Sequence, residues 1–427
     1  MVTPRLRRLT PLLVLETSTL FSGVANGVTM VAFPWLVLDL TGSAAAAGAI
    51  GAITALPLAV SFLFAGAVVD TVGRRRVAVI SDLLSMTSAA LVPLCDATVG
   101  LSFGLLAVLA VMGAVFDPAG VSARETVLPE VAAATGMSRE RVNGLHEAVW
   151  GAAFLVGPGV GGLALGLLGP APTYWISAGM FALSSLVMLG LRVPGAGRPA
   201  EHERPTGILH GTWEGARFIW RDRPLRGMAV ISMVVVGVWL PVEGVVLPVH
   251  FEALDEPTSL GLSVMAMGLG GVVGALVYSA VGHRWPARAT FGWAILLAGL
   301  GVFGMAVLPP LPLFLVFGFA SGLAYGPVGP VINLVMQNRT PFALRGRVVS
   351  MLTSAAYVAG PVGFVLIGPG VQALGVAALM RRWSRGSERY QCRCATLGHG
   401  AGAIATSVSS ASPAPITVPS RSPCPSR

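Results

Sequence analysis

Long apolar runs alternate with short polar segments along most of the chain. A helix that crosses a bilayer needs about 20 apolar residues, and runs of that length fall into two sets. The first set lies at 11–38, 44–69, 77–97, 101–123, 145–168 and 172–192, and the second at 226–250, 259–282, 289–308, 311–336 and 348–369. This pattern predicts an all-α integral membrane protein with eleven clear spans.

The segment 193–225 separates the two sets of runs. It is rich in Pro, Gly, Glu and Arg and ends in the amphipathic stretch Gly211–Trp220. We interpret it as a cytoplasmic linker that ends in an interfacial helix. The division that follows is an N-terminal six-helix half at 1–192 and a C-terminal half at 226–380.

The two halves share short proline-containing motifs at corresponding positions, which indicates an internal repeat. Phe116-Asp117-Pro118 in the fourth run recurs as Tyr325-Gly326-Pro327 in the tenth, and Phe33-Pro34 in the first recurs as Leu247-Pro248 in the seventh. Two repeated halves joined by a linker are typical of transporters whose substrate site lies between the halves, near the middle of the bilayer.

The end of the chain departs from the repeat. A twelfth span is expected near Gln372, but only Ala373–Met380 is apolar before Arg381. Eight residues make about 12 Å of helix, against about 30 Å of hydrocarbon. The twelfth helix is therefore predicted to be missing or broken. The polar stretch 381–427 reads either as a truncated or frameshifted reading frame or as a natural disordered tail.

Composition and charge support the membrane prediction. The chain is 54% hydrophobic and 11% charged, whereas soluble domains carry about 25% charged residues. All 28 basic residues are arginine, and up to residue 380 they fall in alternate loops, Arg124 among them. Because cytoplasmic loops are enriched in basic residues, the N-terminus is expected in the cytoplasm. The net charge of +9 is thereby explained without nucleic acid.

The loop after the second run carries a motif that identifies a family. It contains Gly66, Asp70, Gly73, Arg75 and Arg76 at the spacing G-x-x-x-D-x-x-G-x-R-R. This loop motif closely resembles the signature of the major facilitator superfamily, except that Thr71 stands where a basic residue is usual. The resemblance implies a fold of two six-helix halves, in which the aspartate locks the halves together on the cytoplasmic side.

The fifth run carries a second motif, which we call the Gly-Pro motif. Its members are Gly151, Gly157, Pro158, Gly161 and Gly162. It resembles the motif of the antiporter branches of the family, although glycine-rich helix packing is also common in membranes for other reasons. Together with Asp117-Pro118-Ala119 and Arg345-Gly346-Arg347, it resembles the enterobactin-exporter and macrolide-efflux branch.

Ionisable side chains inside the runs are candidates for proton coupling, because each costs about 2.5–3.5 kcal/mol at a helix centre. Glu243 is the first candidate, since it is deepest and the one arginine of its run, Arg226, stands at the first position of that run. Glu16 is the second candidate for proton coupling. The alternative is that it is an acid at the membrane interface. Asp82 and Glu147 lie near run ends, where charges beside cytoplasmic loops are common, and His146 is expected to face interfacial water.

The resemblance also implies that the first, fourth, seventh and tenth spans line a substrate cavity. The polar and aromatic candidates on those spans are Asn26, Trp239, Tyr325, Asn333 and Gln337. Polar groups that faced lipid would lack partners, so these are expected to face inward. The aromatic rings offer a stacking surface to a hydrophobic or cationic molecule.

The sequence as a whole predicts a secondary active transporter in the cell membrane. We expect proton-coupled efflux of a small organic molecule, such as a drug or siderophore, by alternating access. The alternatives are an importer or facilitator of a metabolite, and a non-transporting product of a damaged gene. No enzyme activity, cofactor or metal site is expected. The expected partners are substrate, protons and the lipid bilayer, and the chain is expected to be monomeric.

Overall fold

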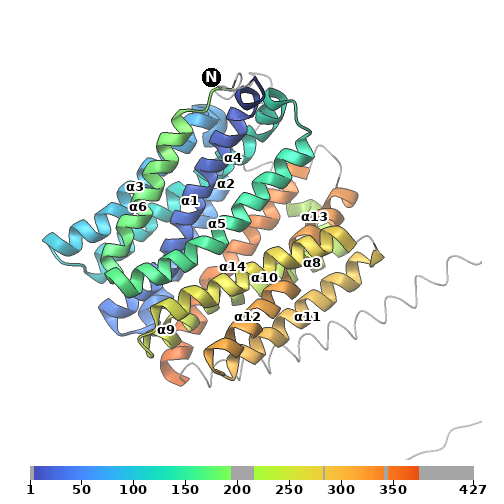
Figure 1. Cartoon of the computed structure of the whole chain (residues 1–427). Coiled ribbons are helices and arrows are strands. Elements are labelled where there is room, and N and C mark those ends of the chain that lie inside the picture. The colour runs from blue at the N-terminus through green and yellow to red at the C-terminus, as the bar shows by residue number, and fades with distance from the viewer. Residues whose placement is uncertain (1–3, 194–215, 282–283, 341–344, 375–427) are drawn as a thin grey trace, which may run out of the picture. The chain divides into compact units, whose positions relative to one another are not determined.

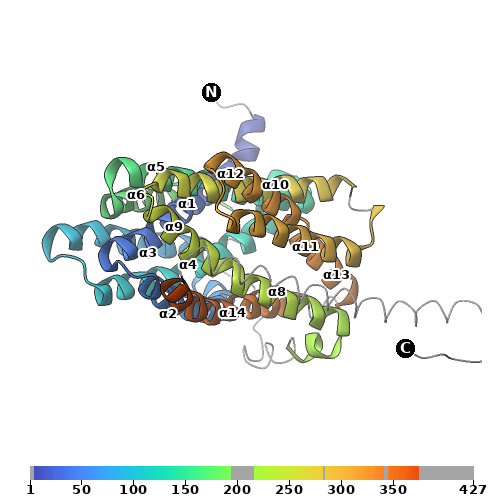
Figure 2. The same cartoon turned by 90° about the horizontal axis from the view of Figure 1, so that it is seen from below.

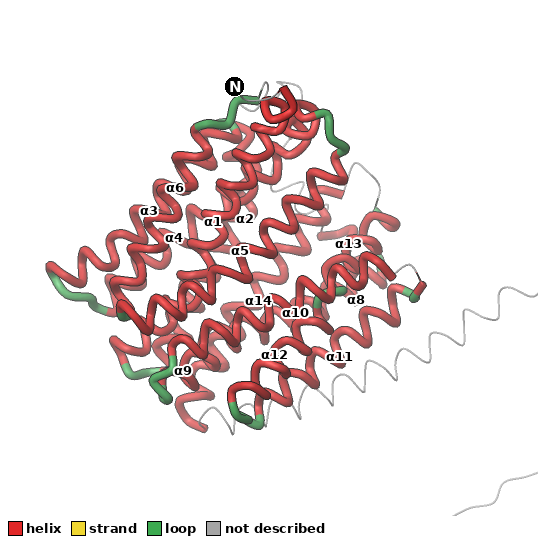
Figure 3. The backbone as a smooth tube through the Cα atoms, in the orientation of Figure 1, coloured by secondary structure: helices red, strands yellow, loops and turns green. Residues whose placement is uncertain are grey.

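The computed structural model describes residues 4–193, 216–281, 284–340 and 345–374. Regular structure in these residues is entirely helical, which confirms the all-α prediction for this part of the chain (Figure 3). The first six helices are α1 (Pro4–Thr41), α2 (Ala44–Val72), α3 (Arg74–Thr98), α4 (Phe103–Thr135), α5 (Arg139–Leu168) and α6 (Pro170–Leu189).

The helices after the linker are more interrupted. They are α8 (Arg223–Pro241), the π-helical turn η2 (Val242–Val246), α9 (Leu247–Glu252), α10 (Pro257–Val281), α11 (Ala287–Ala306), α12 (Leu311–Tyr325), α13 (Val328–Arg339) and α14 (Arg345–Leu374). Every predicted run overlaps one of these helices or a consecutive set of them, although several helices extend beyond their runs. Among the described residues, ten helical stretches are long and apolar enough to span a bilayer, and α14 adds the shorter apolar segment Val358–Ala373.

Two helix pairs join the first six helices to the rest. In Figures 1 and 2, α2 lies beside α14 and α5 lies beside α10, and both pairs are in close contact. Within the first six helices, α1 packs against α4, α5 and α6, while α3 packs against α4 and α6. These two seams therefore carry most of the packing between the helices before and after the linker.

Proline accounts for the interruptions in the seventh and tenth spans. Pro241 ends α8 and Pro248 follows η2, and neither can donate the backbone hydrogen bond of a regular helix. Pro327 lies in the same way between α12 and α13. Loss of these bonds loosens the helix locally, and π-helical turns are frequent at functional sites.

The linker contributes a short helix at 216–221. Its Ile219 packs with Leu225 of α8 and Met336 of α13. The rest of the predicted interfacial stretch Gly211–Trp220, the twelfth span and the tail at 381–427 lie outside the described residues. The boundaries 1–192, 193–225 and 226–380 stay predictions.

Candidate functional site

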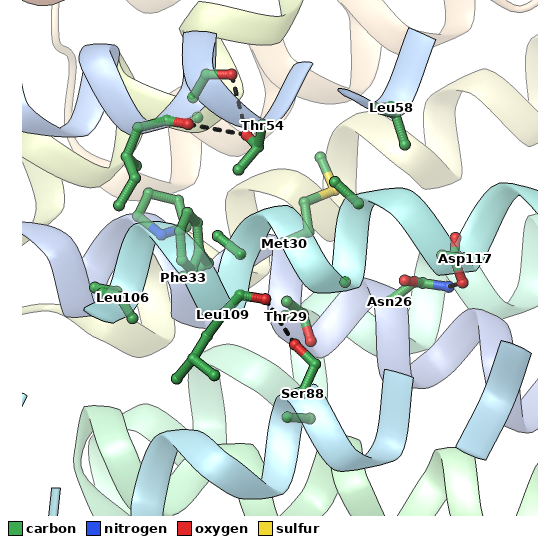
Figure 4. Close-up of a pocket in the computed structure, with 18 of the residues that line it drawn as sticks. Asn26, Thr29, Met30, Phe33, Thr54, Leu58, Ser88, Leu106, Leu109 and Asp117 are labelled. Atoms are coloured by element: carbon green, nitrogen blue, oxygen red, sulfur yellow. Dashed lines mark hydrogen bonds between the residues drawn. The ribbon is translucent and has the colours of Figure 1, made fainter. Parts of the chain in front are cut away.

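A cavity of about 360 Å³ lies among the spans, and we call it the central cavity. Its wall comes mainly from α1, α2, α3, α4 and α6, with Leu240, Gly244 and Phe364 added by α8, η2 and α14. Most of the lining is apolar, including Met30, Phe33 and Leu58 in Figure 4. Such a wall suits a hydrophobic molecule, because apolar surface gains free energy when it leaves water.

The main polar feature of the central cavity is a pair formed by Asn26 of α1 and Asp117 of α4. The side-chain amide of Asn26 donates a hydrogen bond of 2.9 Å to the Asp117 carboxylate (Figure 4). Asn26 thus lines the cavity as the sequence suggested. Asp117 was not selected as a site residue, although it belongs to the Phe116-Asp117-Pro118 repeat. A run-internal acid beside a proline was the signal that could have found it.

A buried charge cluster lies close to this wall and joins four helices. Arg124 of α4 forms an ion pair with Asp82 of α3, and its guanidinium also donates hydrogen bonds to Ser184 of α6 and Ser18 of α1. Ser22 and Ser184 donate further bonds to the Asp82 carboxylate. Asp82 is therefore neutralised by a fixed partner and is not a free charge at a helix end.

The placement of Arg124 in a cytoplasmic loop was wrong. Its side chain is only 1% exposed, because α4 continues to Thr135, well past the predicted run end at 123. The polar residues after Ser122 broke the apolar pattern, but Asp82 and the serine hydroxyls satisfy the buried arginine from neighbouring helices. Arginine is rarely buried unless paired, so its partners were the missing information.

Glu16 of α1 faces His146 of α5, with its carboxylate oxygens 3.1 and 3.2 Å from the Nδ1 atom of the ring. The expectation that His146 faces interfacial water was wrong, because the residue is only 2% exposed. Since α5 begins at Arg139, six residues before the predicted run, His146 lies on its packed face. Glu147, the next residue, is exposed and has no described hydrogen bond.

Glu243 lies in the π-helical turn η2, one turn beyond Trp239. The indole N–H of Trp239 donates a 2.8 Å hydrogen bond to the Glu243 carboxylate. The Trp239 ring stacks on Tyr325 of α12, with centroids 5.6 Å apart and planes at 13°. The structure thus brings together three candidates from the seventh and tenth spans. Trp239 and Tyr325 do not line the central cavity.

The loop motif joins α2 to α3 through a single residue, Gly73. Its φ of 100° lies in the region that favours glycine, and its N–H bonds the Val69 carbonyl to close α2. Arg75 donates to the Leu189 carbonyl at the end of α6, and Arg74 forms an ion pair with Glu130 of α4. Arg76 is exposed. The surroundings of Gly66 and the side chain of Asp70 lie outside what the structure describes.

The Gly-Pro motif has helices packed on two faces of α5. On one face, a Cβ at Gly157 would come within 2.8 Å of the Gly27 Cα of α1, and one at Gly161 within 3.0 Å of Val28. On the other, a Cβ at Gly162 would lie 2.7 Å from the Gly261 Cα of α10.

Two more motif members extend these contacts. A Cβ at Gly151 would lie 3.0 Å from Val272 of α10, and the ring of Pro158 lies against Gly27. The motif therefore lets backbones approach closely at the seam between α5 and α10. The side chains of Asn333 and Gln337, both on α13, lie outside the described residues.

Comparisons with known proteins show which family and which sequences this chain resembles. The sequence profile of the Major Facilitator Superfamily matches residues 15–364. The multidrug efflux pump Tap of Mycolicibacterium fortuitum is 45% identical over 371 residues, which cover 86% of this chain and 91% of that protein. The pump of the same name from Mycobacterium tuberculosis (strain ATCC 25618 / H37Rv) is 44% identical over 371 residues, 86% of this chain and 88% of that protein.

A solved structure agrees at the level of the fold. The crystal structure of the nucleoside transporter NupG matches with a TM-score of 0.74 at 12% identity, over 90% of this chain and 98% of that one. The fold of helices in two sets, the loop motif and the sequence matches together lead to one conclusion: this chain belongs to the Major Facilitator Superfamily.

Proposed function

We propose that this chain exports small organic molecules of the drug type, in exchange for protons, by alternating access. The observation that carries the proposal is the central cavity, which is apolar, lies among the spans and holds the single carboxylate Asp117 in its described wall. The export direction follows from the 44–45% identity to two proteins named multidrug efflux pumps. The cell membrane, with the N-terminus in the cytoplasm, is the proposed location.

Alternating access requires two rigid bodies that rock against each other. The halves at 1–192 and 226–380 serve as those bodies in this proposal. The close backbone contact of Gly162 with Gly261 supports it, because two helices without intervening side chains can slide with little repacking. The loop motif, with Asp70 as its lock, holds the cytoplasmic side closed in one of the two states.

Glu243 is the proposed coupling residue. Asp82 is paired with Arg124, Glu16 faces His146, and Glu147 is exposed, so these three are weaker candidates. Glu243 has one described hydrogen bond, from Trp239, and no described basic partner. Protonation of Glu243 weakens the hydrogen bond from Trp239, and the Trp239–Tyr325 stack carries this change to the tenth span.

Drug accumulation in a pump-deficient bacterium that expresses the chain tests coupling. We expect expression to lower accumulation, and a proton uncoupler to restore it. Efflux that continues with the uncoupler would refute proton exchange. Uptake driven by the same gradient would instead support the rival importer.

Variants of the seventh span test the coupling residue. Glu243→Gln should abolish uncoupler-sensitive efflux, while Glu252→Gln near the end of the same span should leave it intact. Trp239→Phe keeps a ring for the stack but loses the N–H, so we expect an intermediate loss. Full efflux by Glu243→Gln would remove the role assigned to Glu243.

A further inference from the structure

A second cavity, of about 580 Å³, lies at one end of α3 and α6, and we call it the basic pocket. Arg75 and Arg76 come from the first turn of α3, and Arg192 follows the end of α6. The helices α3 and α6 pack side by side (Figure 1). Both are candidate spans, so the pocket at their ends lies where the apolar stretches end. It is separate from the central cavity and shares no lining residue with it.

The basic pocket carries positive charge without a described counter-charge. The first turn of α3 contains no acidic residue, although the N-terminus of a helix is itself electropositive and favours anions. Arg75 uses one donor on the Leu189 carbonyl. Arg76 and Arg192 are exposed, and within the described residues neither has a hydrogen bond or ion pair. Two guanidinium groups at the start of α3 and a third just after the end of α6 therefore favour a bound anion.

The remaining wall of the basic pocket is apolar and open. Ile80 of α3 is 48% exposed and Leu189 of α6 is 49% exposed, and both line it. Farther along the same helices, Leu83 and Leu186 are also exposed. A free inorganic anion would use the arginines and leave this apolar surface uncovered. An anion that carries hydrocarbon chains would use both.

We propose that the basic pocket binds an anionic phospholipid. Its phosphate contacts Arg75, Arg76 and Arg192, and its acyl chains lie along the exposed apolar faces of α3 and α6. Guanidinium groups suit this role because they donate several hydrogen bonds to phosphate oxygens. Basic pockets between spans on the cytoplasmic side are known to hold such headgroups. The bound lipid would tie the start of α3 to the end of α6.

Lipid retention by the purified, delipidated full-length chain tests this proposal. Native mass spectrometry would compare phosphatidylglycerol with zwitterionic phosphatidylethanolamine, each with and without an excess of inorganic phosphate. We expect tighter binding of phosphatidylglycerol, which inorganic phosphate does not displace. Equal binding of the two lipids would overturn the proposal, and displacement by phosphate would overturn the assignment to a lipid.

Variants locate the site. One arginine near an anionic headgroup contributes about fivefold in affinity, so Arg76→Gln combined with Arg192→Gln should weaken phosphatidylglycerol binding about 30-fold. Arg284→Gln, which removes an exposed arginine before α11, is the matched control. The single variant Arg192→Gln changes a residue that lies outside both helices and outside the loop motif. It therefore tests lipid binding without a change to the residues that serve folding and gating. Binding by the double variant equal to that of Arg284→Gln would refute the site.

Discussion

Arg124 is buried among four helices because its partners converge on one atom. Its Nη2 nitrogen makes all the described contacts, with Asp82 on α3, Ser184 on α6 and Ser18 on α1. Burial of a single unpaired charge would be strongly unfavourable, so each helix that supplies a partner is held in place by the others. The cluster ties α1, α3, α4 and α6 together, as the proposed rocking of the halves requires.

Replacement of Arg124 by methionine should leave Asp82 buried and unpaired. The expected cost is about 3–5 kcal/mol of stability, seen as a lower thermal midpoint of the purified protein. Arg124→Lys is the matched variant and should lose much less, because a single nitrogen makes the native contacts. A thermal midpoint that is the same for the methionine and lysine variants would contradict this account of the cluster.

Asp117 should select for charge in the central cavity. Asp117→Asn keeps the size of the side chain and its contact with Asn26 but removes the negative charge. Interactions with a charged group contribute about 1.5–3 kcal/mol, so efflux of cationic drugs should fall about 10- to 150-fold while neutral drugs are exported as before. Ser85→Ala, in the same cavity wall, is the control. An equal loss for both drug types would argue against a charge-selective role.

At the scale of the element, α5 shows how a motif on one helix works through its neighbours. The glycines on one face of α5 touch α1 and stay within the first six helices, while Gly162 meets Gly261 across the seam to α10. The two faces have different consequences. A side chain on the first face should disturb folding, whereas one at Gly162 should act on the seam where the two halves are proposed to move.

Gly162→Ala should therefore slow transport. The new Cβ would lie 2.7 Å from the Gly261 Cα and 2.8 Å from the Pro257 carbonyl, and neither backbone atom can move away easily. We expect a cost of about 1–3 kcal/mol, measured as slower efflux and a lower thermal midpoint. Gly144→Ala, on the same helix with open space around it, should change neither. Equal behaviour of the two variants would refute the role of the seam.

The breaks in the seventh span also depend on a neighbour. Pro241 cannot donate to the Gly237 carbonyl, which a regular helix would bond. A Cβ at Gly363 of α14 would lie 1.7 Å from that oxygen, so α14 packs directly on the freed carbonyl. The two prolines weaken the helix here, but the stack of Trp239 on Tyr325 comes from tertiary packing, which the sequence pattern did not predict.

At the scale of the whole molecule, the sequence predicted what depends on hydrophobic length. The apolar runs gave each described span, because a bilayer fixes how long a buried helix must be. Side-chain partners were harder. The buried positions of Arg124 and His146 depend on Asp82 and Glu16, which lie 42 and 130 residues away along the chain. Hydropathy carries no information about such pairs.

The membrane orientation gives a prediction of its own. With native cysteines replaced by serine, a cysteine at Asp255, in the exposed turn between α9 and α10, should react with a membrane-impermeant maleimide in whole cells. A cysteine at Arg284, before α11, should react only after the cells are opened. Arginine-rich loops are expected inside, so this difference follows from the charge pattern. The reverse labelling would overturn the topology.

The uneven wall of the central cavity has a consequence for how this chain could change over generations. Of the described wall residues, only Leu240, Gly244 and Phe364 come from after the linker. The surface that meets the cargo and the acid proposed to draw on the gradient, Glu243, are therefore encoded in different stretches of the gene. Laboratory evolution against an unfamiliar antibiotic should collect its winning mutations in codons for α1, α2, α3, α4 and α6. The later codons should stay as they are.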